Sequence, residues 1–188
     1  MASDQGHGHK HSPAAKQHHA SAPKAVGCAV ITVSDTRTTG TDSGGDLLAE
    51  LIAGAGHPVV SREIVRDDVA AIRSALERAL ASEACRAVML TGGTGTSPRD
   101  VTPEAVRPLL ERELPGFGEL FRMLSFQEIG PAAMLSRAFA GSRGGKVVFG
   151  LPGSPAAIRL ALERLALPEL GHLVGEATKR PGQHAHKH

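Results

Sequence analysis

Hydrophobic and polar residues alternate in two ways along the middle of the chain. Four runs rich in apolar residues predict strands, and the first is a continuous β-branched run typical of a strand buried on both faces of a sheet. These runs are residues 26–33, 59–65, 87–90 and 146–149. Between the runs, apolar residues recur every three or four positions, which predicts amphipathic helices with starts at Ser43, after Asp67 and Asp68, and after Ser154. Repeated strand–helix units predict an α/β fold with helices on both faces of a mostly parallel sheet.

The length and the ends of the chain bound its organisation. A chain of 188 residues with 41% hydrophobic and 21% charged residues predicts one folded domain. Residues 1–24 and 179–188 are rich in His and lack hydrophobic periodicity, so we expect disordered tails around a domain at 25–178. The tail histidines do not predict a metal site, because a disordered segment does not hold ligands in a fixed geometry.

Composition also excludes several classes of partner. A net charge of +2, five Phe and no Trp or Tyr argue against nucleic-acid binding. Cys28 and Cys85 lie in apolar surroundings without a CxxC spacing, which predicts buried thiols in a reducing compartment. The chain has no apolar run of the roughly 20 residues that a membrane span needs, and no signal-peptide core, so we expect a cytoplasmic protein.

Ligands of parallel α/β sheets bind at the carboxyl ends of the strands. The loop after the third run is glycine-rich, so its backbone N–H groups can converge on phosphate oxygens. It consists of Thr91, Gly92, Gly93, Thr94 and Gly95. It has neither a Walker A nor a GxGxxG spacing, which argues against a dinucleotide-dependent dehydrogenase. The turn with Gly153 and Ser154 predicts a second anion site. Ser34 follows the first run in a hydroxyl-rich loop that also fits an ordinary turn.

Carboxylates lie next to this glycine-rich loop. Asp100 beside a phosphate would be repulsive unless a divalent cation lay between them, so Asp100 and Asp67 predict a magnesium-bridged nucleotide site. The same residues fit another interpretation, in which Asp100 pairs with Arg99 or caps a helix and Asp67 caps its own helix. Thr102 is interpreted as the cap of a helix that Pro103 opens.

Six motifs along the chain occur in an order typical of one family. They are ITVSDTR (31–37), TGGTG (91–95), SPRDVTPEA (97–105), ELPGFGELFRMLSFQEIG (113–130), LSRAFAG (135–141) and LPGSP (151–155). Together they resemble the molybdopterin-binding family, which includes the Mog and B-type molybdenum-cofactor proteins. The resemblance covers nearly all of the chain between the tails, and the FRMLSFQEIG stretch is more similar to the B-type branch.

The resemblance implies a three-layer α/β/α fold of the Mog type, assembled as a homotrimer or homohexamer. In the Mog branch the protein transfers AMP from ATP to the terminal phosphate of molybdopterin, before molybdate insertion. The two acidic residues of that branch fall on Asp67 and Asp100, which the resemblance assigns to catalysis and Mg²⁺ binding. Pterin or phosphate binding would fall to the glycine-rich loop, Ser34, Gly153 and Ser154. Handover of the product to a molybdenum-insertion protein is the expected partner step.

Two other functions fit the same motifs. The protein could carry molybdopterin without chemistry, or serve as an assembly module, although the lack of a second domain argues against the module. Retention of both carboxylates favours the enzyme. We expect Phe117, Phe121 and Phe126 in the core or at a subunit interface. Arg137 is a further candidate for phosphate contact, because its fork suits phosphate.

Overall fold

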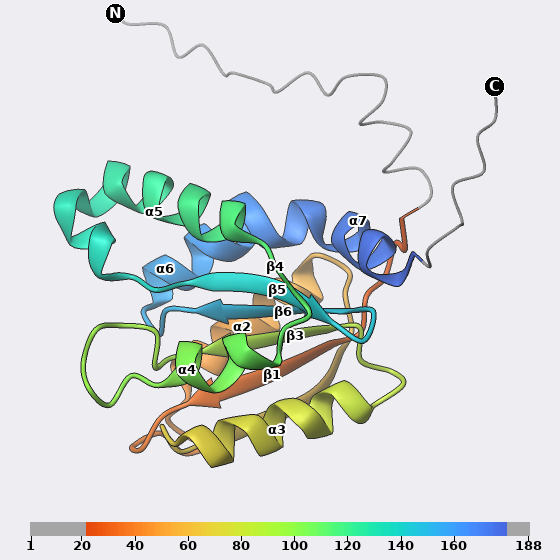
Figure 1. Ribbon diagram of the computed structural model, residues 1–188, viewed down its shortest axis with the longest axis horizontal. Coiled ribbons are helices and arrows are strands. Elements are labelled where there is room, and N and C mark those ends of the chain that lie inside the picture. The colour runs from red at the N-terminus through yellow and green to blue at the C-terminus, as the bar shows by residue number, and fades with distance from the viewer. Residues whose placement is uncertain (1–21, 180–188) are drawn as a thin grey trace, which may run out of the picture.

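A six-stranded sheet forms the centre of the computed structural model, which describes residues 22–179 (Figure 1). The strands lie in the order β2-β1-β3-β6-β5-β4. Their bounds are β1 Cys28–Val33, β2 Val59–Val65, β3 Ala87–Thr91, β4 Arg112–Glu113, β5 Phe139–Arg143 and β6 Lys146–Leu151. The first four strands in this order pair in parallel, whereas β5 and β4 are antiparallel. The expected mostly parallel sheet is confirmed.

Helices cover both faces of this sheet. One layer contains α2 (Ser43–Gly54), α5 (Pro115–Ile129), α6 (Pro155–Ala161) and α7 (Leu167–Thr178), with a π-helical turn, Leu162–Ala166, between α6 and α7. The other layer contains α3 (Val69–Ala81) and α4 (Thr102–Val106). Two 3₁₀ turns complete the chain, Arg107–Leu109 and Gly130–Leu135. Figure 1 shows α5 and α7 above the sheet and α3 below it. The three-layer α/β/α fold is therefore confirmed.

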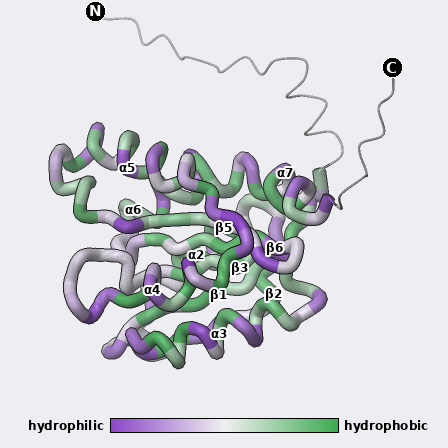
Figure 2. Tube along the Cα trace, in the orientation of Figure 1, coloured by the Kyte–Doolittle hydropathy of each residue, from purple (hydrophilic) through white to green (hydrophobic). Residues whose placement is uncertain are grey.

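The core consists of two apolar layers, one on each side of the sheet. Strands β1 and β3 are buried along their whole length, and Figure 2 shows them as apolar segments at the centre. Phe121, Phe149 and Ile158 lie in one layer, and Ile72 and Leu76 in the other. Burial of such a side chain contributes about 1.5–3 kcal/mol. These layers hold the carboxyl ends of β1, β3 and β6 side by side.

Both cysteines lie in this interior as free thiols, as the apolar runs predict. Burial raises the pKa of Cys28 to about 12, with a contribution from nearby Cys85. The pKa of Cys85 is also raised, mainly by burial. Both thiols are therefore uncharged and poor nucleophiles at neutral pH.

Strand β2 lies at the predicted position but is less buried than β1. Val60, Ser61 and Arg62 are exposed, and Glu63 is half-buried. The reason is position, because β2 lies at the edge of the sheet and has only β1 as a neighbour. Charged residues on an edge strand oppose pairing with another sheet.

The antiparallel strands β4 and β5 were not predicted from the sequence. Strand β4 has only two residues. Strand β5 is joined to β6 by Gly144 and Gly145, with φ of 58° and 72°. Two residues with positive φ form the tight turn that fits the twist of a hairpin. Such short strands leave too few residues for a hydrophobic alternation to be recognised.

Two of the three predicted helix starts are confirmed. The Asp68 carboxylate accepts from Ala71 N at 2.9 Å, and the Ser154 hydroxyl accepts from Ala157 N at 3.4 Å. For α2 the predicted cap, Ser43, is wrong, because Asp42 accepts from Gly45 N at 2.9 Å. The hydroxyl of the buried Thr32 donates to the same carboxylate at 2.8 Å. The hydrogen bond from Thr32 in β1 thus holds Asp42 in the capping position of α2.

The predicted tails lie outside the described residues, apart from residues 22–24 and 179. Among residues 22–179, helices are either too short or too polar to cross a bilayer.

Candidate functional site

A small polar pocket lies at the carboxyl ends of β1, β3 and β6. Its volume is about 200 Å³, and three separate stretches of chain line it. Ser34 and Arg37 come from the loop after β1, Thr91 and Gly92 from the end of β3, and Gly153 from the turn after β6. The fold therefore unites three loops that are far apart in sequence, as expected for a parallel sheet.

Direct contacts hold the second and third of these loops together. The Thr91 hydroxyl donates to the Pro152 carbonyl at 2.9 Å, and Gly92 N donates to the Leu151 carbonyl at 3.1 Å. Gly92 has φ of +100°, and a Cβ there would lie 2.3 Å from the carbonyl oxygen of Val33. Only glycine fits this position. The proton of the Thr91 hydroxyl is thus donated within the protein, whereas the backbone of the loop borders the pocket.

Ser34 and Arg37 provide donors from the first loop. The Ser34 hydroxyl oxygen accepts from the backbone N–H groups of Thr36 and Arg37, at 3.3 and 3.2 Å. Its own proton remains to be donated to a ligand. One nitrogen of the Arg37 guanidinium donates to the Thr41 carbonyl at 2.9 Å, and the side chain lines the pocket. Arg37 was missed as a site residue, although it lies directly after a strand and within the ITVSDTR motif.

Asp67 and Asp100 lie on the far side of the glycine-rich loop. A Cβ on Gly93 would be 2.8 Å from Asp67 Oδ1, and a Cβ on Gly95 would be 2.8 Å from Asp100 Oδ2. Both carboxylates therefore pack directly against the segment that also borders the pocket. The sequence places Asp67 after β2 and Asp100 after β3, and parallel packing brings the two together.

A third carboxylate, Asp35, joins this group and was missed by the sequence analysis. Asp67 N donates to Asp35 Oδ1 at 3.3 Å, and Arg99 forms an ion pair with Asp35. The Arg99 guanidinium holds the pKa of Asp35 below its ordinary value. By contrast, burial raises the pKa of Asp67, and the charges of Asp100 and Asp35 raise it further. The group concentrates negative charge that a cation would neutralise.

The alternative interpretation, in which Asp100 pairs with Arg99 and Asp67 caps a helix, does not agree with the structure. Arg99 pairs with Asp35 rather than with Asp100. The cap of α3 is Asp68 rather than Asp67. The predicted cap of α4, Thr102, is wrong, because its hydroxyl donates to the Gly92 carbonyl at 2.9 Å. The chain before α4 folds back onto the glycine-rich loop. The Thr102 hydroxyl therefore bonds to the Gly92 carbonyl of that loop and does not cap α4.

The donor set at Asp67 and Asp100 fits a magnesium ion. Asp67 Oδ1 accepts from Val101 N at 3.3 Å, and Asp100 Oδ2 accepts from Ser97 N at 2.9 Å. The second oxygen of each carboxylate is left for a cation. Among residues 22–179, no group of three or more His, Cys, Asp and Glu side chains is suited to a metal ion. Magnesium needs no such group, because it binds one or two carboxylates together with substrate phosphates and water.

Other predicted residues lie apart from these two clusters. Thr94 is buried, and its carbonyl accepts from Arg137 N at 2.9 Å. Ser154 caps α6 at the border of the pocket. Phe121 is buried, and Phe117 packs edge-on against Phe149 with ring centroids 5.2 Å apart. Phe126 is 58% exposed, so within a single chain it does not belong to the core.

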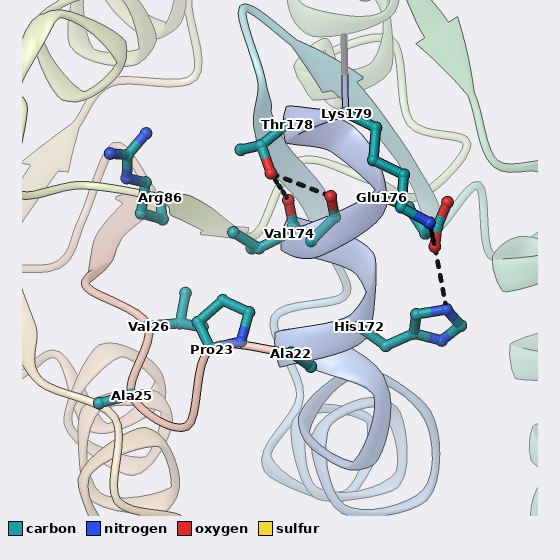
Figure 3. Close-up of a pocket in the computed structure, with 11 residues that line it drawn as sticks. Ala22, Pro23, Ala25, Val26, Arg86, His172, Val174, Glu176, Thr178 and Lys179 are labelled. Carbon is teal, nitrogen blue, oxygen red and sulfur yellow. Dashed lines mark hydrogen bonds and ion pairs between the residues drawn. The ribbon is translucent and has the colours of Figure 1, made fainter. Parts of the chain in front are cut away.

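A larger cavity of about 600 Å³ lies at the opposite, amino end of the sheet, between α7 and the segment before β1 (Figure 3). Several of its polar groups are bonded locally. The Thr178 hydroxyl donates to the carbonyls of Val174 and Gly175, at 3.0 and 2.9 Å, and Lys179 forms an ion pair with Glu176. Ligands of parallel α/β sheets bind at the carboxyl ends of the strands, so size alone does not make this cavity the candidate site.

Comparison with known families identifies the family of the domain that carries this pocket. The family model described as "Probable molybdopterin binding domain" matches residues 29–172, which include every loop of the site. The chain belongs to the family of molybdopterin-binding domains. The resemblance expected from the six motifs is thereby confirmed.

Relatives within this family share about half of the sequence. "Molybdenum cofactor biosynthesis protein B" of Halalkalibacterium halodurans is 50% identical over 165 residues, 87% of this chain and 97% of the relative. A crystal structure of a protein with the same name is 53% identical, covers 85% and 99% of the two chains, and gives a TM-score of 0.82. The tungsten cofactor synthesizing protein MoaB of Pyrococcus furiosus is 40% identical, covers 84% and 100%, and gives 0.77. The expected similarity to B-type members is confirmed.

Proposed function

We propose that the protein acts in molybdenum cofactor biosynthesis, where it binds molybdopterin and adenylylates its terminal phosphate with ATP. The observation that carries this proposal is the adjacency of two unlike clusters across one glycine-rich loop. A pocket with hydroxyl, guanidinium and backbone donors lies on one side, and a pair of carboxylates suited to Mg²⁺ on the other. A reaction between two phosphates needs both the hydrogen-bond donors and the metal ion.

The pocket is the proposed site of the pterin phosphate. Ser34 and Arg37 contribute a hydroxyl proton and a positive charge, and the backbone at Gly92 and Gly153 borders the same space. Ser154 adds a hydroxyl at its rim. Charge-assisted hydrogen bonds of this kind are about twice as strong as neutral ones. The arrangement holds the terminal phosphate of molybdopterin close to the glycine-rich loop.

ATP is proposed to lie across that loop, with its phosphates next to Asp67 and Asp100. Bound Mg²⁺ would neutralise the charge of the ATP phosphates during the transfer. The two carboxylates hold this ion, and the loop backbone orients both substrates. An oxygen of the pterin phosphate then forms a bond to the α-phosphorus of ATP, while the bond to the β-phosphate oxygen breaks and pyrophosphate leaves. The chain supplies position and charge neutralisation rather than a covalent nucleophile.

A homotrimer or homohexamer is the proposed assembly, and the outer face of α5 supports it. Six apolar residues on α5 and the turn after it are 47–73% exposed. They are Leu120, Met123, Phe126, Ile129, Met134 and Leu135. An exposed apolar patch of this kind is typical of a subunit interface. Transfer of the adenylylated pterin to a molybdenum-insertion protein would complete the step.

The decisive experiment incubates the purified protein with molybdopterin, ATP and Mg²⁺, and measures adenylylated pterin and pyrophosphate. We expect both products in equal amounts, and no product when EDTA is present. The Asp100→Ala variant should lose at least about 100-fold in rate yet melt like the wild type. Arg86→Gln at the amino end is the matched control and should keep full activity. Tight pterin binding without product would instead identify a carrier, and no pterin binding would refute both functions.

A further inference from the structure

Arg137, in the segment between the 3₁₀ turn at 130–135 and β5, reaches across to the loop that carries Asp100. Its Nε donates to the Gly95 carbonyl at 2.6 Å, and its Nη2 donates to the Asp100 carbonyl at 2.5 Å. Its Nη1 forms an ion pair with Glu104. Each nitrogen of the guanidinium group is therefore bonded to the protein, and the expected contact with a phosphate stays a prediction for its two remaining N–H groups.

These three bonds fix both ends of one loop. Gly95 begins the segment that ends at Asp100, and Glu104 lies in the short helix α4 that follows. The backbone N–H of Arg137 adds a fourth contact, to the Thr94 carbonyl at 2.9 Å. One side chain and its own backbone thus define the path of residues 94–104, from a distance of about 40 positions in the sequence.

A single peptide group links Arg137 to both catalytic candidates. The carbonyl of the peptide between Asp100 and Val101 accepts from Arg137, while the N–H of the same peptide donates to Asp67 Oδ1 at 3.3 Å. A cation on the carbonyl side polarises a peptide group and strengthens the hydrogen bond of its N–H. Placement of this peptide therefore sets the position of Asp67 relative to Asp100.

We infer that Arg137 is a positioning residue of the adenylyl-transfer site, which holds the two carboxylates in register through the Asp100–Val101 peptide. The catalytic part of this inference rests on the proposed function. Arginine is required because its planar fork bonds three acceptors at once, whereas lysine provides one compact ammonium group. Glu104 orients the fork, and its pKa is held low by Arg137.

A neighbouring arginine offers a matched control. Arg122 and Arg137 line the same cavity of about 490 Å³. Arg122 donates only to the carbonyls of Ser136 and Ala138, at 3.4 and 3.5 Å, and makes no contact with the 94–104 loop among the described residues. Ser136 and Ala138 flank Arg137, but loss of Arg122 leaves the three bonds from Arg137 to the loop in place while it removes a similar charge from the same cavity.

The first test is hydrogen–deuterium exchange of the whole protein, which does not depend on any reaction. Loss of charge-assisted hydrogen bonds, each about 1.5–3 kcal/mol, corresponds to at least about tenfold faster opening. We expect this acceleration in peptides spanning residues 94–104 of Arg137→Gln, a smaller one in Arg137→Lys, and none in Arg122→Gln. Unchanged exchange in Arg137→Gln would overturn the inference. Faster exchange that extends equally into β3 would show general destabilisation and would also overturn it.

The second test is steady-state adenylylation with the same variants. A positioning role predicts that kcat falls at least about tenfold in Arg137→Gln, with the KM for molybdopterin within about twofold of wild type, because the pterin pocket lies across the loop. Glu104→Gln, which keeps both backbone bonds, should be the mildest variant. A raised KM with unchanged kcat would make Arg137 a substrate-binding residue instead. If the wild type has no activity, the proposed function fails, while the exchange result still decides the role of Arg137 in the loop.

Discussion

Two glycines with positive φ show how differently the two ends of the sheet are built. At the carboxyl end, Gly92 has φ of +100°, and a Cβ would lie 2.3 Å from a backbone oxygen. At the amino end, Gly144 has φ of +58°, with nothing within 4 Å of such a Cβ. The first position is constrained by a crowded crossing of loops, the second only by a hairpin turn. At Gly92, crowding and positive φ occur together, at the end where the pocket lies, although the larger cavity lies at the other.

The charged groups also differ between the two ends of the sheet. At the amino end, the Lys146 ammonium donates to the carbonyls of Leu80 and Ser82, both at 2.6 Å, which satisfies the end of α3. At the carboxyl end, burial raises the pKa of Asp67, and the charges of Asp100 and Asp35 raise it further. Unrelieved repulsion and strain are typical of functional sites, because binding of the ligand relieves them. The charged groups favour the carboxyl end as the candidate site, whereas cavity size would favour the amino end.

The largest expected effect comes from Gly92→Ala. A methyl group there meets the Val33 carbonyl oxygen in addition to the cost of positive φ, so we expect the free energy of unfolding to fall by about 3 kcal/mol or more. Gly144→Ala should cost only about 1 kcal/mol, because it adds the φ term alone. Urea denaturation of both variants measures the difference. Equal losses of unfolding free energy in the two variants would mean that crowding at Gly92 adds nothing to the cost of positive φ.

Asp67→Asn should stabilise the protein while abolishing activity. The folded pKa of Asp67 is raised, so ionisation of this group at neutral pH opposes folding, and its stabilising contribution is lost as the pH rises through the folded value. The amide oxygen still accepts from Val101 N. We expect the Tm at pH 7 to rise by about 2–4 °C, with the difference from wild type shrinking as the pH is lowered toward 4. Asp46→Asn, which removes the exposed ion pair with Arg62, should give no such rise. A lower Tm for Asp67→Asn would contradict the repulsion.

The smallest expected effect concerns His57, which lies near the amino end of β1. Burial lowers its pKa, and Nδ1 of the ring accepts from Val26 N at 3.2 Å. A lowered folded pKa gives stability that is complete above the unfolded value of about 6.5 and is lost as the pH falls below it. The Tm of the wild type should therefore drop between pH 7 and pH 5.5 by about 2 °C more than that of His57→Asn. Parallel pH profiles of the two proteins would contradict this assignment.

The sequence predicted those parts of the molecule that depend on local patterns. Continuous apolar runs identified β1, β3 and β6, and helical spacing identified α3 and α6, because burial on both faces or on one stripe leaves a clear periodicity. The polar edge strand β2 was also placed correctly, and its exposure follows from its position at the edge of the sheet. Strands β4 and β5 were missed because two to five residues carry too little pattern. Tertiary contacts, rather than local sequence, also chose Asp42 over Ser43 as the cap of α2.

The sequence placed candidate residues where strand ends could be counted, but it could not show which side chains cross between loops. Asp67, Asp100 and the glycine-rich loop were predicted from their positions after strands, and their catalytic role stays a prediction. Asp35 was missed because its partner Arg99 lies 64 residues away. Arg137 was predicted to contact phosphate, and its bonds to three acceptors on a distant loop could not be predicted from the sequence around it.

The order of the strands also governs when the pocket can exist during synthesis. Strand β6 is the last strand in the sequence of the described residues, yet it lies between β3 and β5 inside the sheet. A nascent chain that has not yet released residue 155 has an open β3 edge and lacks the third wall of the pocket. Chains emerge from the ribosome amino end first, so an incomplete chain lacks the complete pocket.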